Sequence, residues 1–144
     1  AKEEFQIDGI VSGALFSVYQ RDRIEKICDK LGLKIFSPLW HKPQKQHMRE
    51  VVDNGFEVVL TAIAGEGLNK SWLNRRITHK DLIALRELGR KIKFNQAGEG
   101  GEFESLVLDC PLFSKKIVLE DVDIVEENEC TAHMVVKKAV LVDK

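Results

Sequence analysis

The order strand, helix, strand within the first 36 residues constrains the fold of this chain more than any other feature. Residues 7–15 form an apolar run interrupted by two glycines, which is typical of a buried parallel strand. Ser17 then begins a helical pattern over residues 18–31, and Gly32 follows that pattern as a C-cap. Residues 33–36 complete a βαβ unit, and such units bind ligands beyond the carboxyl ends of their strands.

After this unit the pattern changes to consecutive strands with fewer helices between them. Helices are predicted at residues 44–53, at residues 71–77 and after Thr78, where one face of the last helix would carry Leu82, Ile83, Leu85, Leu88 and Ile92. Strands are predicted at residues 56–63, 103–108, 116–120, 122–125 and 133–142. The change of order predicts a boundary near residues 41–46, between one domain over residues 1–43 and a smaller α+β domain over residues 44–144.

The near balance of charge argues against a polyanion as the partner of this chain. Lys and Arg together number 22 and Asp and Glu 23, so no overall field attracts nucleic acid or an acidic membrane. The three cysteines lie outside any CxxC or Cys/His pattern, which predicts reduced thiols in a cytoplasmic protein and no disulfide or zinc framework. No segment has the apolar length of a transmembrane helix. The four histidines show no metal-ligand or triad-like spacing, and we assign them no catalytic role.

The loop that follows the first predicted strand is the first candidate for ligand binding. Gly13 allows close approach of the backbone, and Ser17 stands at a helix N-terminus, which can hold an anion. Tyr19 and Gln20 follow in the first turn, and the guanidinium of Arg23 suits a phosphate because it can donate two parallel hydrogen bonds. On spacing alone, a solvated first turn with a capping serine is the simpler interpretation.

The segment "GEGGEFES" before the predicted strand at residues 103–108 is the second candidate. Glu99, Glu102 and Glu104 would repel a phosphate, but they suit a magnesium ion, an amine nucleophile or a quaternary ammonium group. If Phe103 begins a strand, Glu102 and Glu104 share one face and Phe103 points to the other. A solvated approach to a hairpin remains the alternative, because Gly and Glu are ordinary loop residues.

Two further residues stand beside these segments. Trp40 follows the second predicted strand and is either an aromatic side chain of a cleft or an anchor at a domain interface. Cys110 lies at the end of a predicted strand, before Pro111, and is interpreted as a small buried hydrophobe and not as a nucleophile.

Three stretches resemble the diphthine-ammonia ligase family of ATP-binding PP-loop enzymes. They are "GALFSVYQRDRIEKICDKLGLKIFSPLW", "GFEVVLTAIAGEGLNKSWLNRRI" and "AGEGGEFESLVLDCPLF", which occur in this order within residues 7–113. The resemblance implies that residues 1–43 are the end of a HUP-like (Rossmann-like) nucleotide domain with a parallel sheet. It also implies that residues 44–144 form the smaller α+β domain that carries the EGGEFES motif.

The resemblance implies ATP-dependent amidation of diphthine on translation elongation factor two. The carboxylate of diphthine would be activated by ATP, with Mg²⁺, as an acyl-adenylate, and ammonium would supply the nitrogen. Within this family pattern the candidate catalytic residues are Glu99, Glu102 and Glu104. The candidate nucleotide-binding residues are Gly13, Ser17, Tyr19, Gln20 and Arg23, and the candidate substrate-binding residues are Trp40, Gly100, Gly101 and Ser105.

The family's phosphate-binding loop, of the SGGKDS type, occurs nowhere in this sequence. We therefore expect the chain to be a part of a longer protein. By itself, without the rest of that protein, we expect it to be inactive and not to hydrolyse ATP. Two alternatives stay open: an adenylating PP-loop enzyme with another acceptor, and a non-catalytic module that docks the elongation factor. Diphthamide implies an archaeal or eukaryotic source, with the archaeal one favoured, and exposed strand edges allow a homo-oligomer.

Overall fold

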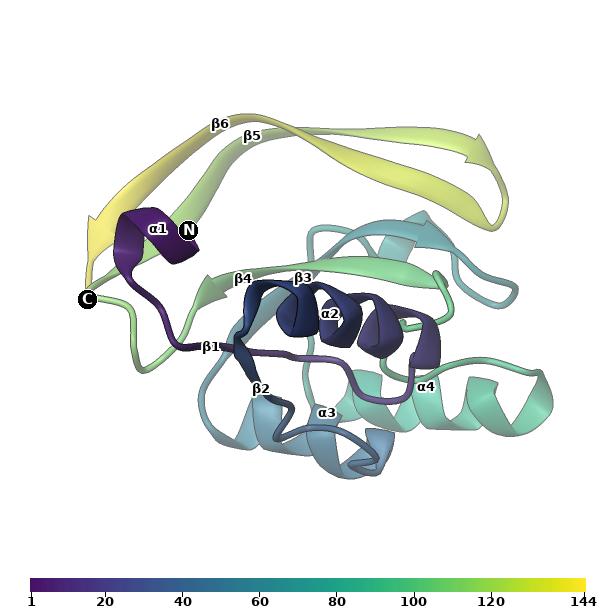
Figure 1. Ribbon diagram of the computed structural model, residues 1–144. Helices are drawn as coiled ribbons and strands as arrows, with labels where there is room; N and C mark the ends of the chain where they lie inside the picture. Colours follow the sequence, from purple (N-terminus) through teal and green to yellow (C-terminus); the bar gives the residue numbers. More distant parts are fainter. The chain divides into compact units, whose positions relative to one another are not determined.

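Two units, Ala1–Gln44 and Lys45–Lys144, make up the computed structural model, which describes residues 1–144 (Figure 1). The first unit contains α1 (Lys2–Phe5), β1 (Gly9–Val11), α2 (Val18–Leu31) and β2 (Lys34–Phe36). Strands β1 and β2 are parallel, with Gly9 beside Lys34 and Val11 beside Phe36, so the predicted βαβ unit is confirmed. The first strand is much shorter than the predicted residues 7–15, because β2 offers a partner over only three positions.

Helix α2 has the predicted bounds because both of its ends carry local stop signals. Ser17 is the N-cap, and its side chain accepts a hydrogen bond from the backbone N–H of Gln20 at 3.4 Å. Gly32 adopts a left-handed conformation with φ 61° and donates its N–H to Asp29 O. The helix buries Cys28 against the rest of its unit.

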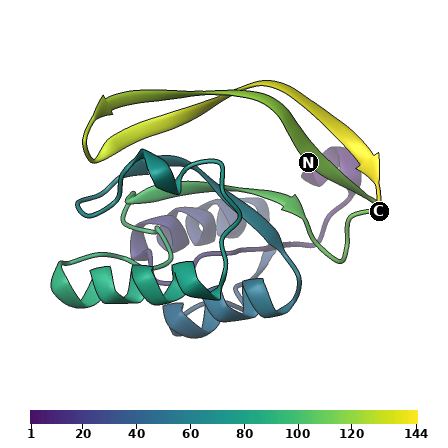
Figure 2. The same ribbon diagram turned by 180° about the vertical axis from the view of Figure 1, so that it is seen from behind.

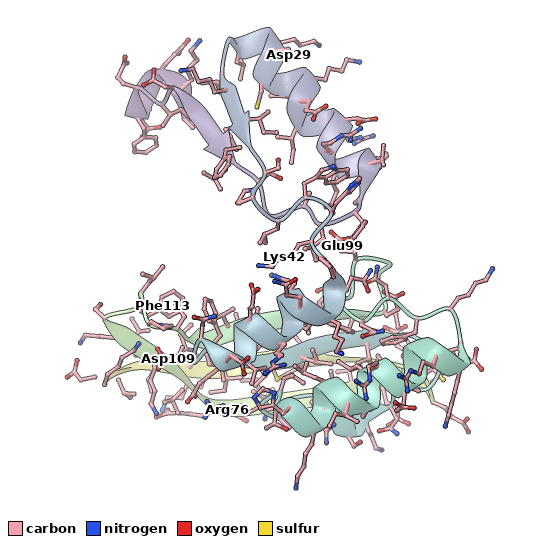
Figure 3. The ribbon with its side chains drawn as sticks, turned by 90° about the horizontal axis from the view of Figure 1, so that it is seen from below. Asp29, Lys42, Arg76, Glu99, Asp109 and Phe113 are labelled. Atoms are coloured by element: carbon pink, nitrogen blue, oxygen red, sulfur yellow. The ribbon has the colours of Figure 1, made fainter.

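The second unit is an antiparallel sheet with helices against one face. Its strands follow the order β4-β3-β6-β5, and α3 and α4 lie side by side on the same face of β3 and β4 (Figures 1 and 3). The long hairpin of β5 and β6 arches over the other side of these two strands, as the view from behind also shows (Figure 2). The elements are α3 (Gln44–Asp53), β3 (Glu57–Ala64), η1 (Lys70–Trp72), α4 (His79–Lys91), β4 (Phe103–Asp109), β5 (Lys115–Asn128) and β6 (Thr131–Asp143).

One core holds the second unit together. It includes Leu60 and Ile63 of β3, Leu85 of α4 and Phe103 of β4, all of which are at least 93% buried. Leu82, Leu88 and Ile92 pack against this core, as predicted. Ile83 does not, because it lies one residue around the helix from Leu82 and leaves 54% of its surface exposed.

Two predicted elements of this unit are wrong. The pair of strands at residues 116–120 and 122–125 is one strand, β5, whose pairing with β6 shifts register between Leu119 and Val122. The two acidic residues at this point mark a β-bulge and not the end of a strand. The predicted helix at residues 71–77 is only the 3₁₀ turn η1, after which Leu73 and Arg76 form isolated bridges with Leu60 and Val59.

None of the helices has the length and apolar character needed to cross a bilayer.

Candidate functional site

The acidic, glycine-rich segment is a loop between α4 and β4 that is anchored in the core at both ends. Phe94 precedes it and Phe103 follows it, and both rings are buried with their centroids 6.3 Å apart. Within the loop, the N–H of Gly98 donates to Asn95 O and the N–H of Gly101 donates to Gly98 O, each at 3.0 Å. The loop is therefore a succession of tight turns between two fixed points. We call residues 95–105, which are this loop and the first three residues of β4, the acidic loop.

Glu102 is the centre of the acidic loop. One carboxylate oxygen accepts a hydrogen bond from the N–H of Asn95 at 2.8 Å, and the other accepts one from the N–H of Gly100 at 3.0 Å. Its carbonyl oxygen also accepts the N–H of Ala64 at 2.8 Å, which ties the loop to the end of β3. The carboxylate therefore organises the backbone of the loop through two charge-assisted hydrogen bonds.

The close wrapping of the loop explains two of its glycines. Gly98 has φ 76°, and a Cβ at this position would lie 2.7 Å from the ring of Phe103. A Cβ on Gly100 would lie 2.5 Å from a carboxylate oxygen of Glu102. The glycines thus allow the chain to pass directly over an aromatic ring and a carboxylate.

The remaining residues of the motif lie at the surface. Glu104 is exposed and stands opposite Ala62 of β3, whereas its neighbour Phe103 is buried, as the predicted alternation requires. Ser105 is exposed but borders a cavity of about 240 Å³ between α3, α4 and the sheet. The other side chains that line this cavity are mostly apolar. Glu99 is half-buried within the loop, and Gly101 is exposed. The three glutamates therefore have three different environments.

The candidate nucleotide residues of the first unit gather at the start of α2. Ser17 caps this helix, and the guanidinium carbon of Arg23 lies 4.1 Å from the centre of the Tyr19 ring, one turn away. Gln20 contributes its backbone N–H to the cap. A Cβ on Gly13 would meet no atom within 4 Å, so nothing in this unit itself requires a glycine there.

An aromatic stack in the same unit was missed by the sequence analysis. The ring of His41 stacks on Phe16 with centroids 5.4 Å apart and on Trp40 with centroids 4.8 Å apart. The guanidinium carbon of Arg21 lies 4.7 Å from the centre of the Trp40 ring, and the hydrogen bond of Arg21 to Asp22 raises its pKa. Each of the three rings follows a strand of the βαβ unit in the sequence, and this placement is the signal from which the stack could have been predicted. Flat rings beside a helix N-terminus suit a planar or cationic group.

The structure thus defines a two-unit α/β protein with one candidate ligand-binding region in each unit. In comparisons with known families, residues 2–35 match the diphthamide synthase N-terminal domain, and residues 43–142 match the diphthamide synthase C-terminal domain. The chain belongs to the diphthamide synthase family.

Similar proteins of known name come from fungi and animals. A protein of Schizosaccharomyces pombe named diphthine--ammonia ligase is 38% identical over 138 residues, which are 96% of this chain and 23% of that protein. The proteins of the same name from Danio rerio and Homo sapiens are 38% and 35% identical, each over 86% of this chain. The chain spans 49% and 46% of their respective lengths, or about half of each animal relative.

Proposed function

We propose that this chain belongs to an ATP-dependent ligase that amidates diphthine, a modified histidine of translation elongation factor two. The observation that carries the proposal is the match of both family models, in order, over nearly the whole chain. The names of the relatives support the same reaction. The quoted motifs resemble those of PP-loop enzymes, and this resemblance is the reason for proposing ATP as the nucleotide.

The proposed reaction has two steps. A carboxylate oxygen of diphthine attacks the α-phosphorus of ATP, so that pyrophosphate leaves and an acyl-adenylate forms. Ammonia then attacks the acyl carbon, AMP leaves with the electron pair of the broken bond, and the nitrogen loses a proton to a base. Magnesium would enter with the phosphates of ATP, because proteins usually hold this ion through one or two carboxylates together with the phosphates of the substrate.

The geometry of the acidic loop supports separate roles for its glutamates. Glu102 already accepts two backbone hydrogen bonds, so we assign it to positioning the loop. Glu104 is an exposed carboxylate at the start of an edge strand, so we assign it to the trimethylammonium group of diphthine or to ammonium. Glu99, Gly100, Gly101 and Ser105 complete the proposed acceptor region around these two residues.

For the nucleotide we propose the start of α2. Ser17 caps the helix next to N–H groups that attract an anion, and Arg23 and Tyr19 form an exposed pair one turn further on. Gly13 and Gln20 belong to the same region, and Trp40 with its stacked neighbours lies beyond β2. The phosphate-binding loop of the family would come from chain outside this sequence.

The test is amide formation on diphthine-bearing elongation factor two, with ATP and ammonium, by a full-length protein that contains this sequence. We expect the full-length protein to form the amide and Glu104→Gln to lower kcat/KM for the protein substrate by roughly tenfold or more, about 1.4 kcal/mol. The matched control is Glu129→Gln, an exposed glutamate in the turn between β5 and β6, which should leave the rate unchanged.

Other outcomes select other functions. Adenylate formation without amidation of this substrate would point to a different acceptor for the same adenylating chemistry. Binding of the elongation factor that needs no ATP and yields no product would identify a docking module. Equal loss of rate in the Glu104 and Glu129 variants would contradict the role given to the acidic loop.

A further inference from the structure

A pocket of about 180 Å³ lies between α3 and α4, in a part of the second unit that the proposed reaction does not use. Its lining combines basic and apolar side chains. Lys45 and Arg49 come from α3, His79 and Arg86 come from α4, and Leu82 and Ile83 of α4 are the apolar part of the lining. We call it the basic pocket.

The basic groups of this pocket outnumber the acidic groups that neutralise them. Asp53 is shared, because its two oxygens lie 3.0 Å from Arg49 Nε and 3.1 Å from His79 Nε2. The closest carboxylate oxygen recorded for Arg86 belongs to Glu87 and lies 3.7 Å away, which is too long for a hydrogen bond. The three side chains of the pocket that are always charged, Lys45, Arg49 and Arg86, thus have two carboxylates beside them, which leaves a local positive charge in a chain with almost no net charge.

The guanidinium of Arg86 is poorly satisfied. About two thirds of the Arg86 side chain is buried, and its buried Nε donates a hydrogen bond to no acceptor. A buried N–H group without an acceptor is unfavourable, so the native position of the Arg86 guanidinium is not fixed by a hydrogen bond at Nε. A guanidinium that no carboxylate already holds can donate a pair of hydrogen bonds to an oxyanion.

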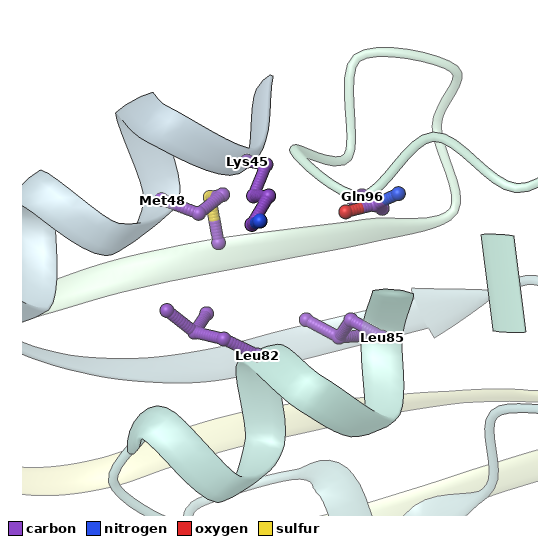
Figure 4. Close-up of a pocket in the computed structure, with 5 residues that line it drawn as sticks. All are labelled: Lys45, Met48, Leu82, Leu85 and Gln96. Atoms are coloured by element: carbon purple, nitrogen blue, oxygen red, sulfur yellow. The ribbon is translucent and has the colours of Figure 1, made fainter. Parts of the chain in front are cut away.

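The basic pocket continues toward the acidic loop. A small crevice shares Lys45 and Leu82 with it and is completed by Met48, Leu85 and Gln96 (Figure 4). In Figure 4, Lys45 and Met48 descend from α3 and Leu82 and Leu85 rise from α4, with Gln96 of the acidic loop beside them. A ligand held by Lys45 would therefore lie next to the base of the acidic loop.

We propose that the basic pocket binds a phosphate group. Its donors come from two helices on opposite sides of the pocket, which suits a tetrahedral oxyanion with oxygens in several directions. A single carboxylate is planar and is satisfied by one arginine fork, so it would leave the remaining basic groups unused. The phosphate is either a free inorganic anion or part of a nucleotide. The inference does not depend on diphthine as the substrate.

The experiment is isothermal titration of the 144-residue chain with inorganic phosphate, pyrophosphate, AMP and citrate at low ionic strength. We expect saturable binding of pyrophosphate that is tighter than the binding of citrate. Arg86→Gln should weaken pyrophosphate binding roughly tenfold, the loss expected for a charge-assisted hydrogen bond. Arg90→Gln is the matched control, because Arg90 lies on the same helix, pairs with Glu87 at 2.9 Å and does not line the pocket.

Each result decides the matter. Absence of saturable phosphate or pyrophosphate binding, or equal weakening by the Arg86 and Arg90 variants, would overturn the proposal in favour of no site or of general charge attraction. Citrate binding as tight as pyrophosphate would overturn the phosphate assignment. Weakening of AMP binding as well as of pyrophosphate binding by Arg86→Gln would support a nucleotide phosphate, and weakening of pyrophosphate binding alone would support a free anion. If Arg86→Gln fails to fold by circular dichroism, Lys45→Gln at the exposed start of α3 repeats the test.

Discussion

At the scale of single residues, the glutamates of the acidic loop differ in what holds their carboxylates. Glu102 is bound by the N–H groups of Asn95 and Gly100, so it belongs to the structure of the loop. Glu104 is exposed on an edge strand and is available to a ligand. A family motif that is read as one acidic patch therefore combines a positioning residue with a surface carboxylate.

This division predicts different effects on stability. We expect Glu102→Ala to lower the free energy of unfolding by about 1–3 kcal/mol, because two backbone N–H groups lose their acceptor. Glu104→Ala should change it by less than about 0.5 kcal/mol, as is usual for an exposed side chain. Urea denaturation of the two variants beside the parent chain measures the difference. Equal losses would mean that the loop does not depend on the Glu102 carboxylate.

At the scale of elements, the start of α4 is held by a buried carboxylate. Asp81, in its first turn, accepts hydrogen bonds from Thr78 N at 2.8 Å and from Thr78 Oγ1 at 2.6 Å. The other oxygen of Asp81 pairs with Arg75 at 2.8 Å, and the residue is 91% buried. This cap fixes the helix that carries Leu85 into the core and Arg86 into the basic pocket.

Removal of this cap should be costly. We expect Asp81→Ala to lower the free energy of unfolding by about 2–3 kcal/mol, because a buried cap and an ion pair are lost together. The comparison is Ser17→Ala at the start of α2, which removes one 3.4 Å hydrogen bond at the surface and should cost about 0.5–1 kcal/mol. Thermal unfolding followed by circular dichroism ranks the two. A larger loss for Ser17→Ala would contradict the assigned importance of the α4 cap.

At the scale of the whole molecule, the two units differ in the size of the hydrophobic core that each contains. Every residue of the main buried cluster, from Leu60 to Ala132, belongs to Lys45–Lys144. Ala1–Gln44 has one sheet of two three-residue strands and buries only a few side chains, among them Leu15, Cys28 and Leu33. A segment as short as Ala1–Gln44 rarely folds alone without disulfides, metals or a partner.

We therefore expect the segment of residues 45–144 to fold by itself and the segment of residues 1–44 to remain without stable structure. The measurement is thermal and urea unfolding of the two segments, produced separately, by circular dichroism. A cooperative transition in the larger segment and none in the smaller one is the expected pair of results. A larger segment that unfolds without cooperativity would mean that its core needs the first unit.

The sequence by itself determined the features whose causes lie within a few residues. Helix α2 could be predicted to the residue because Ser17 and Gly32 act on their nearest turns, and α3 ends where Asn54 and Gly55 break the pattern. The order of the motifs was enough to recognise the family, and the motif identified the acidic loop as a candidate site.

Only the tertiary structure decided the features that depend on residues far apart in the chain. The pairing with β6 keeps β5 continuous through the bulge, and the bridges to β3 replace most of the helix expected at residues 71–77. The aromatic stack joins Phe16 to His41, and the basic pocket joins Lys45 to Arg86. Propensities and caps act over about one helical turn, whereas strand register and pockets are set by packing between elements, which no local pattern encodes.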